Sequence, residues 1–487
     1  MAKVNEVSAA IAAMQPDWAK IDALCGGTKA MRAAKETYLP KFPAEDQESY
    51  DYRVKTSTLY NALGRTLENM AAKPFAEAIT FTDLDPVAEE WLEDIDQCGN
   101  NVTVFAHSVF TEGLAKGMTH ILVEVPRTVD ENGNLLYPTK AAEDAAGVRP
   151  YWVHIKPGQI IDAIPMKGPG GAQVIGQVRF MECIEEPPAE GEFGSTSVQQ
   201  IRVLEPGRWA TYRKGTGTQK DTWLLHDEGV TSLDFVPMVT FYTKRTGFMT
   251  AEPPLLNLAD LNIKHWQSSS DQDSILHTAR VPLLAISGMQ DDDKVEIGAK
   301  SFLRLPTGAE AKYVEHTGAA IEAGRLSLED LKSEMSSMGA ELLKPSLVAA
   351  TATQSNIEDG DSKCQLSRMV QTLEDTLDNA MDISYKFKNM EYKGDLDIFD
   401  DFASDSLLAT AGPFMIALQQ IVNNRMLDRK TAFEELQRYG ILNPDLNWED
   451  IQGQIELEGP EFDVSMPGAA TPAPAPSPTP APAPATE

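Results

Sequence analysis

Apolar residues recur at helical spacing over residues 251–280, a stretch bounded by prolines. Pro253 and Pro254 stand where prolines commonly open a helix, and Pro282 follows the expected end. The apolar positions form one face on either side of a polar centre at 267–274: Leu255, Leu256, Leu258, Leu261 and Trp266, then Ile275 and Leu276. Such a helix would be about 40 Å long and is too polar at its centre for an ordinary core. We therefore expect it to connect layers of structure or to pack beside copies of itself around a wet space.

A second long helix is predicted over 324–345 and a third over 362–399. In the second, apolar residues follow at steps of three and four until Pro345: Leu328, Leu331, Met335, Met338 and Leu342. The third carries an amphipathic pattern from Leu366 to Met381. Between the first two helices, residues 281–323 contain three short strand patterns, at 281–287, 301–305 and 311–314, and predict a small α/β or β insert. Small polar residues over 346–361 predict a loop.

The first 250 residues change in texture from helix to strand near residue 125. Helices are predicted at 4–14, 50–72, 86–96 and 102–116. One antiparallel β layer is expected next, with strands at 119–125, 152–155, 174–183, 200–204, 209–212, 222–225 and 237–242, and a loop at 185–197. Residues 400–457 are predicted to be helical, chiefly at 406–424 and 429–439, and the Pro/Ala-rich residues 458–487 to form a disordered tail. The fold class is therefore α+β.

Charge and composition narrow the range of functions. The 487 residues include 42 Lys and Arg against 73 Asp and Glu, a net charge of −31, which argues against a general surface for binding phosphates. No apolar run is long enough to span a membrane, and the N-terminus lacks the apolar core of a signal peptide. The four cysteines form no CxxC pair, which indicates reduced thiols: Cys25, Cys98, Cys183 and Cys364.

Catalytic motifs for nucleotide, metal-protease and serine-hydrolase chemistry are missing from the sequence, so no enzyme, catalytic residue, metal or cofactor is expected. His265 and His277 fall on one predicted helix but too far apart to bind one metal ion. One acidic cluster offers an alternative, because carboxylates bind Mg²⁺ or Ca²⁺: Asp395, Asp397, Asp400 and Asp401. A metal-dependent hydrolase or nuclease would use these residues, whereas a solvated acidic surface is the simpler interpretation.

Two further segments are candidate contact sites. The turn at Asp291, Asp292, Asp293 and Lys294, with Glu296 beyond it, lies between the two long helices and is a candidate docking surface or an ordinary charged turn. The loop at 346–361 offers neutral hydroxyl and amide groups that can touch phosphates without holding them: Thr351, Thr353, Gln354, Ser355 and Asn356. A plain surface connector is the alternative for this loop.

The order of these segments resembles the portal proteins of tailed bacteriophages. Three stretches carry the resemblance: TLYNALGRTLENMAAKPF (58–75), PPLLNLADLNIKHWQSSSD (253–271) and VPLLAISGM (281–289). Their order and spacing extend the likeness over roughly residues 40–455. The resemblance implies a virion protein that forms a ring of twelve subunits at one capsid vertex, after assembly in the host cytoplasm, through which double-stranded DNA is packaged and ejected.

The resemblance also assigns a role to each segment. Residues 1–250 and 362–399 would form the wing, 251–280 and 324–345 the stem helices, 281–323 the clip, 346–361 the tunnel loop and 400–457 the crown. The clip would dock the large terminase subunit and later the head-to-tail adaptors, and the ring would sit in the major capsid protein shell. Two features depart from the family pattern: the tunnel loop has no Lys or Arg, and the Pro/Ala tail is not required. Another head-to-tail connector or minor capsid protein is the alternative within the same class.

Overall fold

The computed structural model describes residues 3–128, 134–186, 193–215, 219–220, 222–231, 233–279, 283–287, 310–314, 319–343, 364–400, 402, 429–438, 447–448 and 452. The chain divides into two compact units, Met1–Ala403 and Ser404–Glu487. The described part of the second unit contains helix α12 (Arg429–Arg438), where the ring of Phe433 lies 5.4 Å from that of Trp448. Predictions at 301–305, 406–424 and 458–487 lie outside the described residues.

The first unit begins with a helical region. Its helices are α1 (Ala9–Cys25), α2 (Gly27–Ala34), α3 (Gln47–Thr56), α4 (Ala62–Ala72), α5 (Pro86–Glu93), α6 (Val102–Lys116) and the short α7 (Lys140–Ala145). Short 3-10 turns occur at Lys35–Thr37, Lys73–Phe75, Pro157–Gln159, Pro169–Gly171 and Glu341–Leu343. Helix α1 is longer than the predicted 4–14, because its buried face continues past Pro16 through Trp18, Ile21 and Leu24.

The single helix predicted over 50–72 is wrong, because the chain breaks into α3 and α4. At the end of α3, the Ser57 hydroxyl donates to the Arg53 carbonyl at 2.7 Å, and the backbone becomes extended. At the start of α4, the Asn61 side chain accepts from the backbone N–H of Gly64 at 2.9 Å. Both are side-chain caps of helix ends, and an apolar stripe does not reveal them.

The β region forms two main sheets instead of the one predicted layer. A three-stranded sheet has the order β3 (Tyr151–Ile155), β2 (Met118–Glu124), β9 (Met238–Tyr242). A five-stranded sheet runs in chain order through β4 (Ile160–Lys167), β5 (Gln173–Glu186), β6 (Thr196–Glu205), β7 (Arg208–Lys214) and β8 (Trp223–Val230). Strand β4 was not predicted, because its sequence contains Pro165; a proline is tolerated there because β4 is an edge strand.

Three two-stranded antiparallel ladders complete the described strands. They pair β1 (Thr80–Thr82) with β14 (Asp395–Asp397), β10 (Arg245–Gly247) with β11 (Thr250–Ala251), and β12 (Leu283–Ser287) with β13 (Glu310–Val314). The last pair corresponds to two of the strands predicted between the long helices. Mixed helix and sheet agree with the predicted α+β class.

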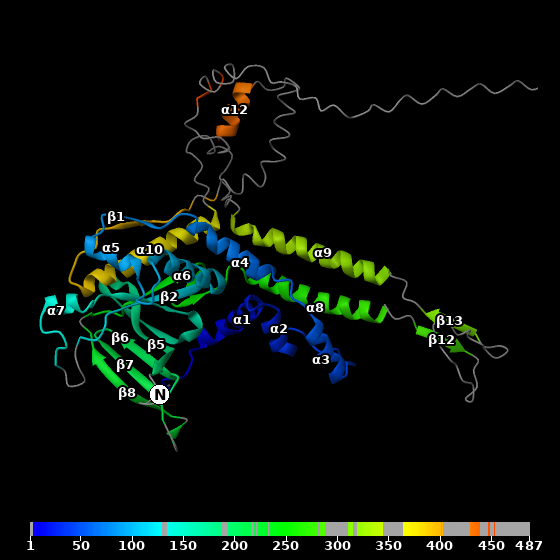
Figure 1. Ribbon diagram of the computed structural model, residues 1–487, viewed down its shortest axis with the longest axis horizontal. Coiled ribbons are helices and arrows are strands. Elements are labelled where there is room, and N and C mark those ends of the chain that lie inside the picture. The colour runs from blue at the N-terminus through cyan, green and yellow to red at the C-terminus, as the bar shows by residue number, and fades with distance from the viewer. Residues whose placement is uncertain are drawn as a thin grey trace, which may run out of the picture. The chain divides into compact units, whose positions relative to one another are not determined.

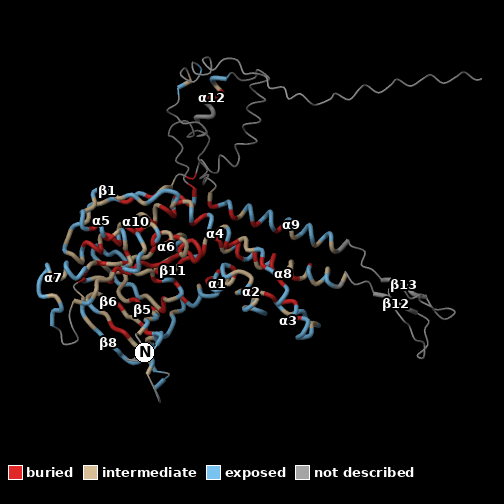
Figure 2. The backbone as a smooth tube through the Cα atoms, viewed as in Figure 1, coloured by how far each residue is buried: buried red, intermediate tan, exposed pale blue. Residues whose placement is uncertain are grey.

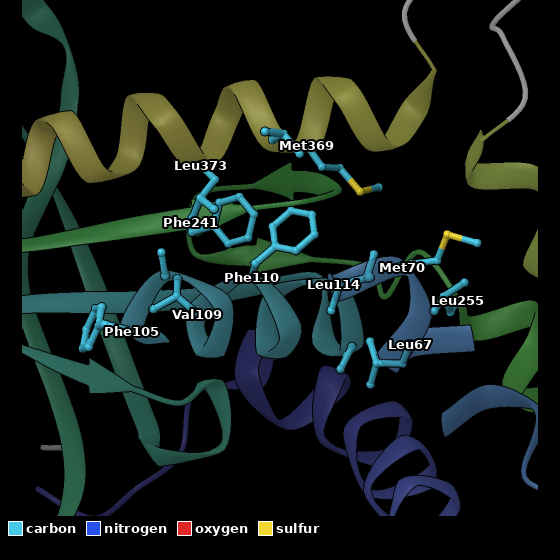
Figure 3. Close-up of a cluster of buried hydrophobic side chains, with 14 of the residues drawn as sticks. Leu67, Met70, Phe105, Val109, Phe110, Leu114, Phe241, Leu255, Met369 and Leu373 are labelled. Atoms are coloured by element: carbon cyan, nitrogen blue, oxygen red, sulfur yellow. The ribbon is translucent and has the colours of Figure 1, made fainter. Parts of the chain in front are cut away.

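The three predicted long helices are present as α8 (Leu256–Ala279), α9 (Ala319–Gly339) and α10 (Gln365–Phe387). The third helix is shorter than the predicted 362–399: α10 ends at Phe387, and residues 395–397 form β14. Figure 1 shows α8 and α9 side by side, with α4 beside them and α10 across the region of α6 and β2. The main core joins these elements, and Figure 2 shows its buried residues gathered around α6 and α10. In Figure 3, Phe110 of α6 and Phe241 of β9 lie beneath Met369 and Leu373 of α10. The first half of α8 is thereby anchored in the core.

Two histidines of the three-stranded sheet are shielded from water, His120 completely and His154 in part. His120 is fully buried, its Nδ1 lies 3.0 Å from Thr240 Oγ1, and burial, with a smaller effect of His154, lowers its pKa to about 3. Burial, together with the nearby Lys156, lowers the pKa of His154 to about 4. Both imidazoles are therefore neutral in the folded protein at neutral pH.

Acid is expected to destabilise the fold through His120. The unfolded chain protonates this histidine below about pH 6.5, whereas the folded chain resists protonation down to about pH 3. The unfolded state thus binds the extra proton, and stability falls as the pH falls through this window, by about 2 kcal/mol at pH 5. Urea unfolding at pH 7.5 and 5.0 measures the effect. His120→Gln should reduce the difference, while the same change at the exposed His226 should leave it unchanged; equal differences in both variants would refute the assignment.

Candidate functional site

The paired helices α8 and α9 are the candidate functional site. They run antiparallel, because Gln272 near the end of α8 donates to the carbonyl of Ile321 near the start of α9, at 2.9 Å. Farther along, Lys332 of α9 lies close enough to His265 of α8 for its charge to lower the pKa of the histidine. The pair is long and one end of it packs in the core, so it has the geometry of a two-helix arm.

The apolar stripes of both helices pack largely within the chain. Five of the nine residues predicted to pack these helices are buried, with exposed fractions of 5% or less: Leu258, Trp266, Leu331, Met335 and Leu342. Leu261 and Met338 are partly buried against the core. Leu276 is half-buried, and Ile275 remains 37% exposed in the single chain. The exposed one of these nine residues therefore lies near the end of α8, away from the core.

The polar residues of α8 make specific contacts with its own chain. Asn262 is fully buried; its Oδ1 accepts from the backbone N–H of Leu63 at 3.0 Å, and its Nδ2 donates to the carbonyl of Tyr60 at 2.8 Å. The hydroxyl oxygens of Ser270 and Ser57 lie 2.9 Å apart in a buried setting.

Gln267 continues this pattern by donating to the carbonyl of Tyr38 at 3.1 Å. The polar centre of α8 was expected to lie beside a wet space, and these contacts show that part of it does not. Within 267–274, the Gln267 amide satisfies a backbone carbonyl and the Ser270 hydroxyl meets that of Ser57, so part of the centre faces protein instead of water.

An aromatic ring connects the two helices to the start of α4. The ring of Tyr60 lies 5.4 Å from that of His265, and Lys332 Nζ lies 5.2 Å from the centre of the same tyrosine ring. His265 is buried, and burial followed by the charge of Lys332 lowers its pKa. A neutral His265 thus belongs to the packing of the pair, which makes it a poor choice as a surface control in assembly experiments.

Gly324 lets α9 approach α8 closely. A Cβ atom at this position would lie 2.0 Å from Gln272 Oε1. Gln272 is itself buried and hydrogen-bonded to Ile321. The absence of a side chain at 324 therefore permits the bond that joins the helices.

Gly324→Ala is expected to lower the free energy of unfolding by about 1 kcal/mol. Alanine gains about 1 kcal/mol of helix propensity over glycine, but the displaced Gln272 amide loses its bond and stays buried, which costs about 1–3 kcal/mol. In a Gln272→Ala background no clash exists, so the same change should stabilise by about 1 kcal/mol. A double-mutant cycle by urea unfolding tests this reversal of sign; additive effects would show that the two side chains do not meet.

The helix pair is acidic. The residues of α8 and α9 together carry seven carboxylates and three cations. Arg325 is bonded to both Glu322 and Glu329 on α9, and Asp260 of α8 pairs with Lys20 of α1 at 2.7 Å. A surface of this charge repels phosphate groups at long range.

Two of the predicted contact sites lie outside the described residues. They are the turn with Asp291, Asp292, Asp293, Lys294 and Glu296, and the loop with Thr351, Thr353, Gln354, Ser355 and Asn356. Both predictions remain open.

The acidic cluster near residue 400 has no support as a metal site. Asp395 and Asp397 are exposed at the two ends of β14, on either side of the buried Leu396. Asp400 accepts from the Gln371 side chain at 3.3 Å, and Asp401 lies outside the described residues. No group of three or more His, Cys, Asp or Glu in the described part of the chain is arranged to hold a metal ion. The hydrolase alternative is therefore not retained.

Sequence reasoning missed Asn262, Gln272 and Gly324 as determinants of the helix pair. Asn262 could have been found, because it stands four residues from both Leu258 and Trp266 and so belongs to the buried face. The pairing of Gln272 with Gly324 carries no such signal, since it depends on how the two helices meet.

Cysteines and membrane spans give two further results. None of the four cysteines is in a disulfide; Cys364 is buried and the other three are exposed. Among the residues that the structure describes, no helix combines the length and apolar character needed to cross a membrane.

Comparison with known proteins places the helix pair in a defined segment. A family model described as a domain of unknown function (DUF4055) matches residues 254–388, which contain α8, α9 and α10. No curated protein matches the chain.

Similar solved structures come from gene transfer agent (GTA) particles. A chain from the neck of an empty GTA particle is 12% identical, with a TM-score of 0.38, and the match covers 82% of this chain and 90% of that one. A chain from the virion of a native GTA particle has the same identity and TM-score, with 84% and 98% covered. At this TM-score, the likeness assigns neither a family nor an activity.

Proposed function

We propose that this chain is a structural subunit of a phage-like particle, and specifically a portal protein that forms a ring around a DNA channel. The observation that carries the proposal is the α8–α9 pair, two long antiparallel helices separated in sequence by the β12–β13 hairpin. The pair packs at one end in a mixed helix and sheet core. This packing and its position in the chain support the proposal, together with the resemblance of residues 40–455 to portal proteins.

The parts of the chain take the roles that the resemblance gives them. We assign the stem to 251–280 and 324–345, the clip to 281–323, the tunnel loop to 346–361, the wing to 1–250 and 362–399, and the crown to 400–457. We assign no role to residues 458–487. The clip would dock the large terminase subunit and then the head-to-tail adaptors, and the wing would contact the major capsid protein.

The charge of the helix pair suits this role. A wall of cations would hinder DNA that must slide through a channel, because Lys and Arg bind phosphates strongly. An acidic pair of helices would instead let DNA pass. The proposal requires no catalysis by the chain, and the motor that moves DNA would be the terminase.

Assembly tests the proposal directly. Electron microscopy and mass photometry of the purified full chain should show closed rings with the mass of about twelve subunits, formed alone or with the major capsid protein present. A chain that stays monomeric at micromolar concentration, even with capsid protein, would count against it. A ring with a different subunit number, found at another position in the neck, would favour a different head-to-tail connector.

A further inference from the structure

A polar groove lies between α4 and α9, on the described surface of the first unit. Its volume is about 250 Å³. Arg65, Thr66 and Asn69 of α4 line one side, and Lys332 and Ser336 of α9 line the other, with Tyr60 at one end. The groove therefore presents a guanidinium, an ammonium, three hydroxyls and an amide, all of which can donate hydrogen bonds.

The geometry of the groove depends on a glycine. At Gly339 of α9, a Cβ atom would lie 2.9 Å from Thr66 Oγ1, so the two helices approach closely at this end. Met70 and Met335 are buried below the polar residues. Since both walls are rigid helices packed on the core, the donors are held close together.

Neither cation of the groove has a carboxylate partner among the described residues. Arg65 and Lys332 are the only charged residues that line it, and both are exposed. Neither makes an ion pair among the described residues, and Lys332 contacts only the face of the Tyr60 ring. In a chain of net charge −31, two unpaired cations in a groove without a carboxylate indicate a site for an anionic group.

The same helix pair also carries carboxylates without partners. Asp273, Asp330 and Glu334 are exposed and make no ion pair among the described residues, unlike Glu322 and Glu329, which are bonded to Arg325. In a ring, each subunit presents two different surfaces to its two neighbours. The unpaired carboxylates of one subunit could then contact the unpaired cations of its neighbour.

We propose that the groove between α4 and α9 binds a side-chain carboxylate from the helix pair of a second copy of this chain. This inference rests on the proposed function, because it names a contact that holds the ring together. Double-stranded DNA fits the groove less well, since it carries a charge every ~1.7 Å and would meet Asp330 and Glu334 on the same helix as Lys332. A single carboxylate of a neighbour enters the groove alone.

Charge reversal in the groove tests the contact. Lys332→Glu and Arg65→Glu should each raise the concentration of half-assembly at least about tenfold, measured by mass photometry. Arg65→Glu should leave the thermal unfolding of the monomer unchanged, because Arg65 is exposed, whereas Lys332→Glu should lower it slightly, because it loses the contact with the Tyr60 ring. Lys264→Glu is the matched control: it makes the same charge change at an exposed position of α8 outside the groove and should leave assembly unchanged. Adding Asp273→Lys, Asp330→Lys or Glu334→Lys to the Lys332→Glu chain should restore rings in one of the three cases.

Each other outcome overturns the inference in a recognisable way. Rings of unmodified protein that form equally well with Lys332→Glu and Arg65→Glu would exclude the groove while leaving the proposed function intact. An unmodified chain that forms no ring would overturn both. Unchanged ring formation with weaker binding of a labelled DNA duplex at low salt would show that the groove takes a phosphate of DNA.

Discussion

Replacing Asn262 with alanine is expected to lower the free energy of unfolding by about 3 kcal/mol. The side chain is fully buried and satisfies two backbone groups, the N–H of Leu63 and the carbonyl of Tyr60. Alanine would leave both without a partner in a setting that water does not reach, and each unpaired group costs about 1–3 kcal/mol. Urea or guanidinium unfolding of the purified chain measures the loss.

Two variants make the Asn262 result interpretable. Asn257 lies on the same helix and is exposed, so Asn257→Ala should change stability by less than about 0.5 kcal/mol. Asn262→Asp keeps the acceptor for Leu63 but removes the donor to Tyr60 and adds a buried charge at neutral pH, so it should destabilise at least as much as alanine. A loss at Asn262 no larger than that at Asn257 would show that the bonds contribute nothing net.

Changing Ile275 and Leu276 to aspartate is expected to abolish ring assembly while the monomer stays folded. Ile275 is 37% exposed and Leu276 half-buried in the single chain, so charges there cost the monomer little. In a ring, the same charges would be desolvated at an apolar contact between subunits. The concentration of half-assembly should therefore rise about a hundredfold or more, as measured by mass photometry.

The control for this experiment must be another exposed position of α8. His265 is unsuitable, because it is buried against Tyr60 and its replacement would disturb packing. Asn257→Asp introduces the same charge on an exposed surface and should assemble normally. Thermal unfolding of each monomer separates lost assembly from lost folding. Normal rings from the Ile275→Asp, Leu276→Asp chain would remove the end of α8 from the subunit contact.

Helices with complete local signals were predicted most accurately. The prediction of 102–116 coincides with α6, because both ends are encoded nearby: Asn101 caps the first turn by accepting from the N–H of Val104, and Gly117 ends the helix at a φ of 89°. The stripe from Leu328 to Leu342 likewise predicted α9 and its 3-10 extension. In both cases residues within a few positions of each other decide the structure.

Errors arose where the structure is decided by features other than the spacing of apolar residues. Side-chain caps divide 50–72 into α3 and α4, and strand pairing divides the β region into two sheets; neither is expressed in the spacing of apolar residues. At the acidic cluster near residue 400, a solvated surface was the simpler interpretation and a metal site the alternative. Strand β14 places Asp395 and Asp397 on an exposed surface, in line with the simpler interpretation.

The sequence by itself determined the α+β class, the order of the elements, and the existence of two long helices separated by strands. These follow from local periodicity and from the prolines and glycines that end each element. Only the tertiary structure decided what the polar centre of α8 contacts and where the groove beside α9 lies. Asn262 bonds to Leu63 across 199 positions of the chain, and Arg65 and Lys332 line one groove only because α4 packs against α9. Such contacts depend on how the helices cross, and crossing is set by the packing of whole surfaces.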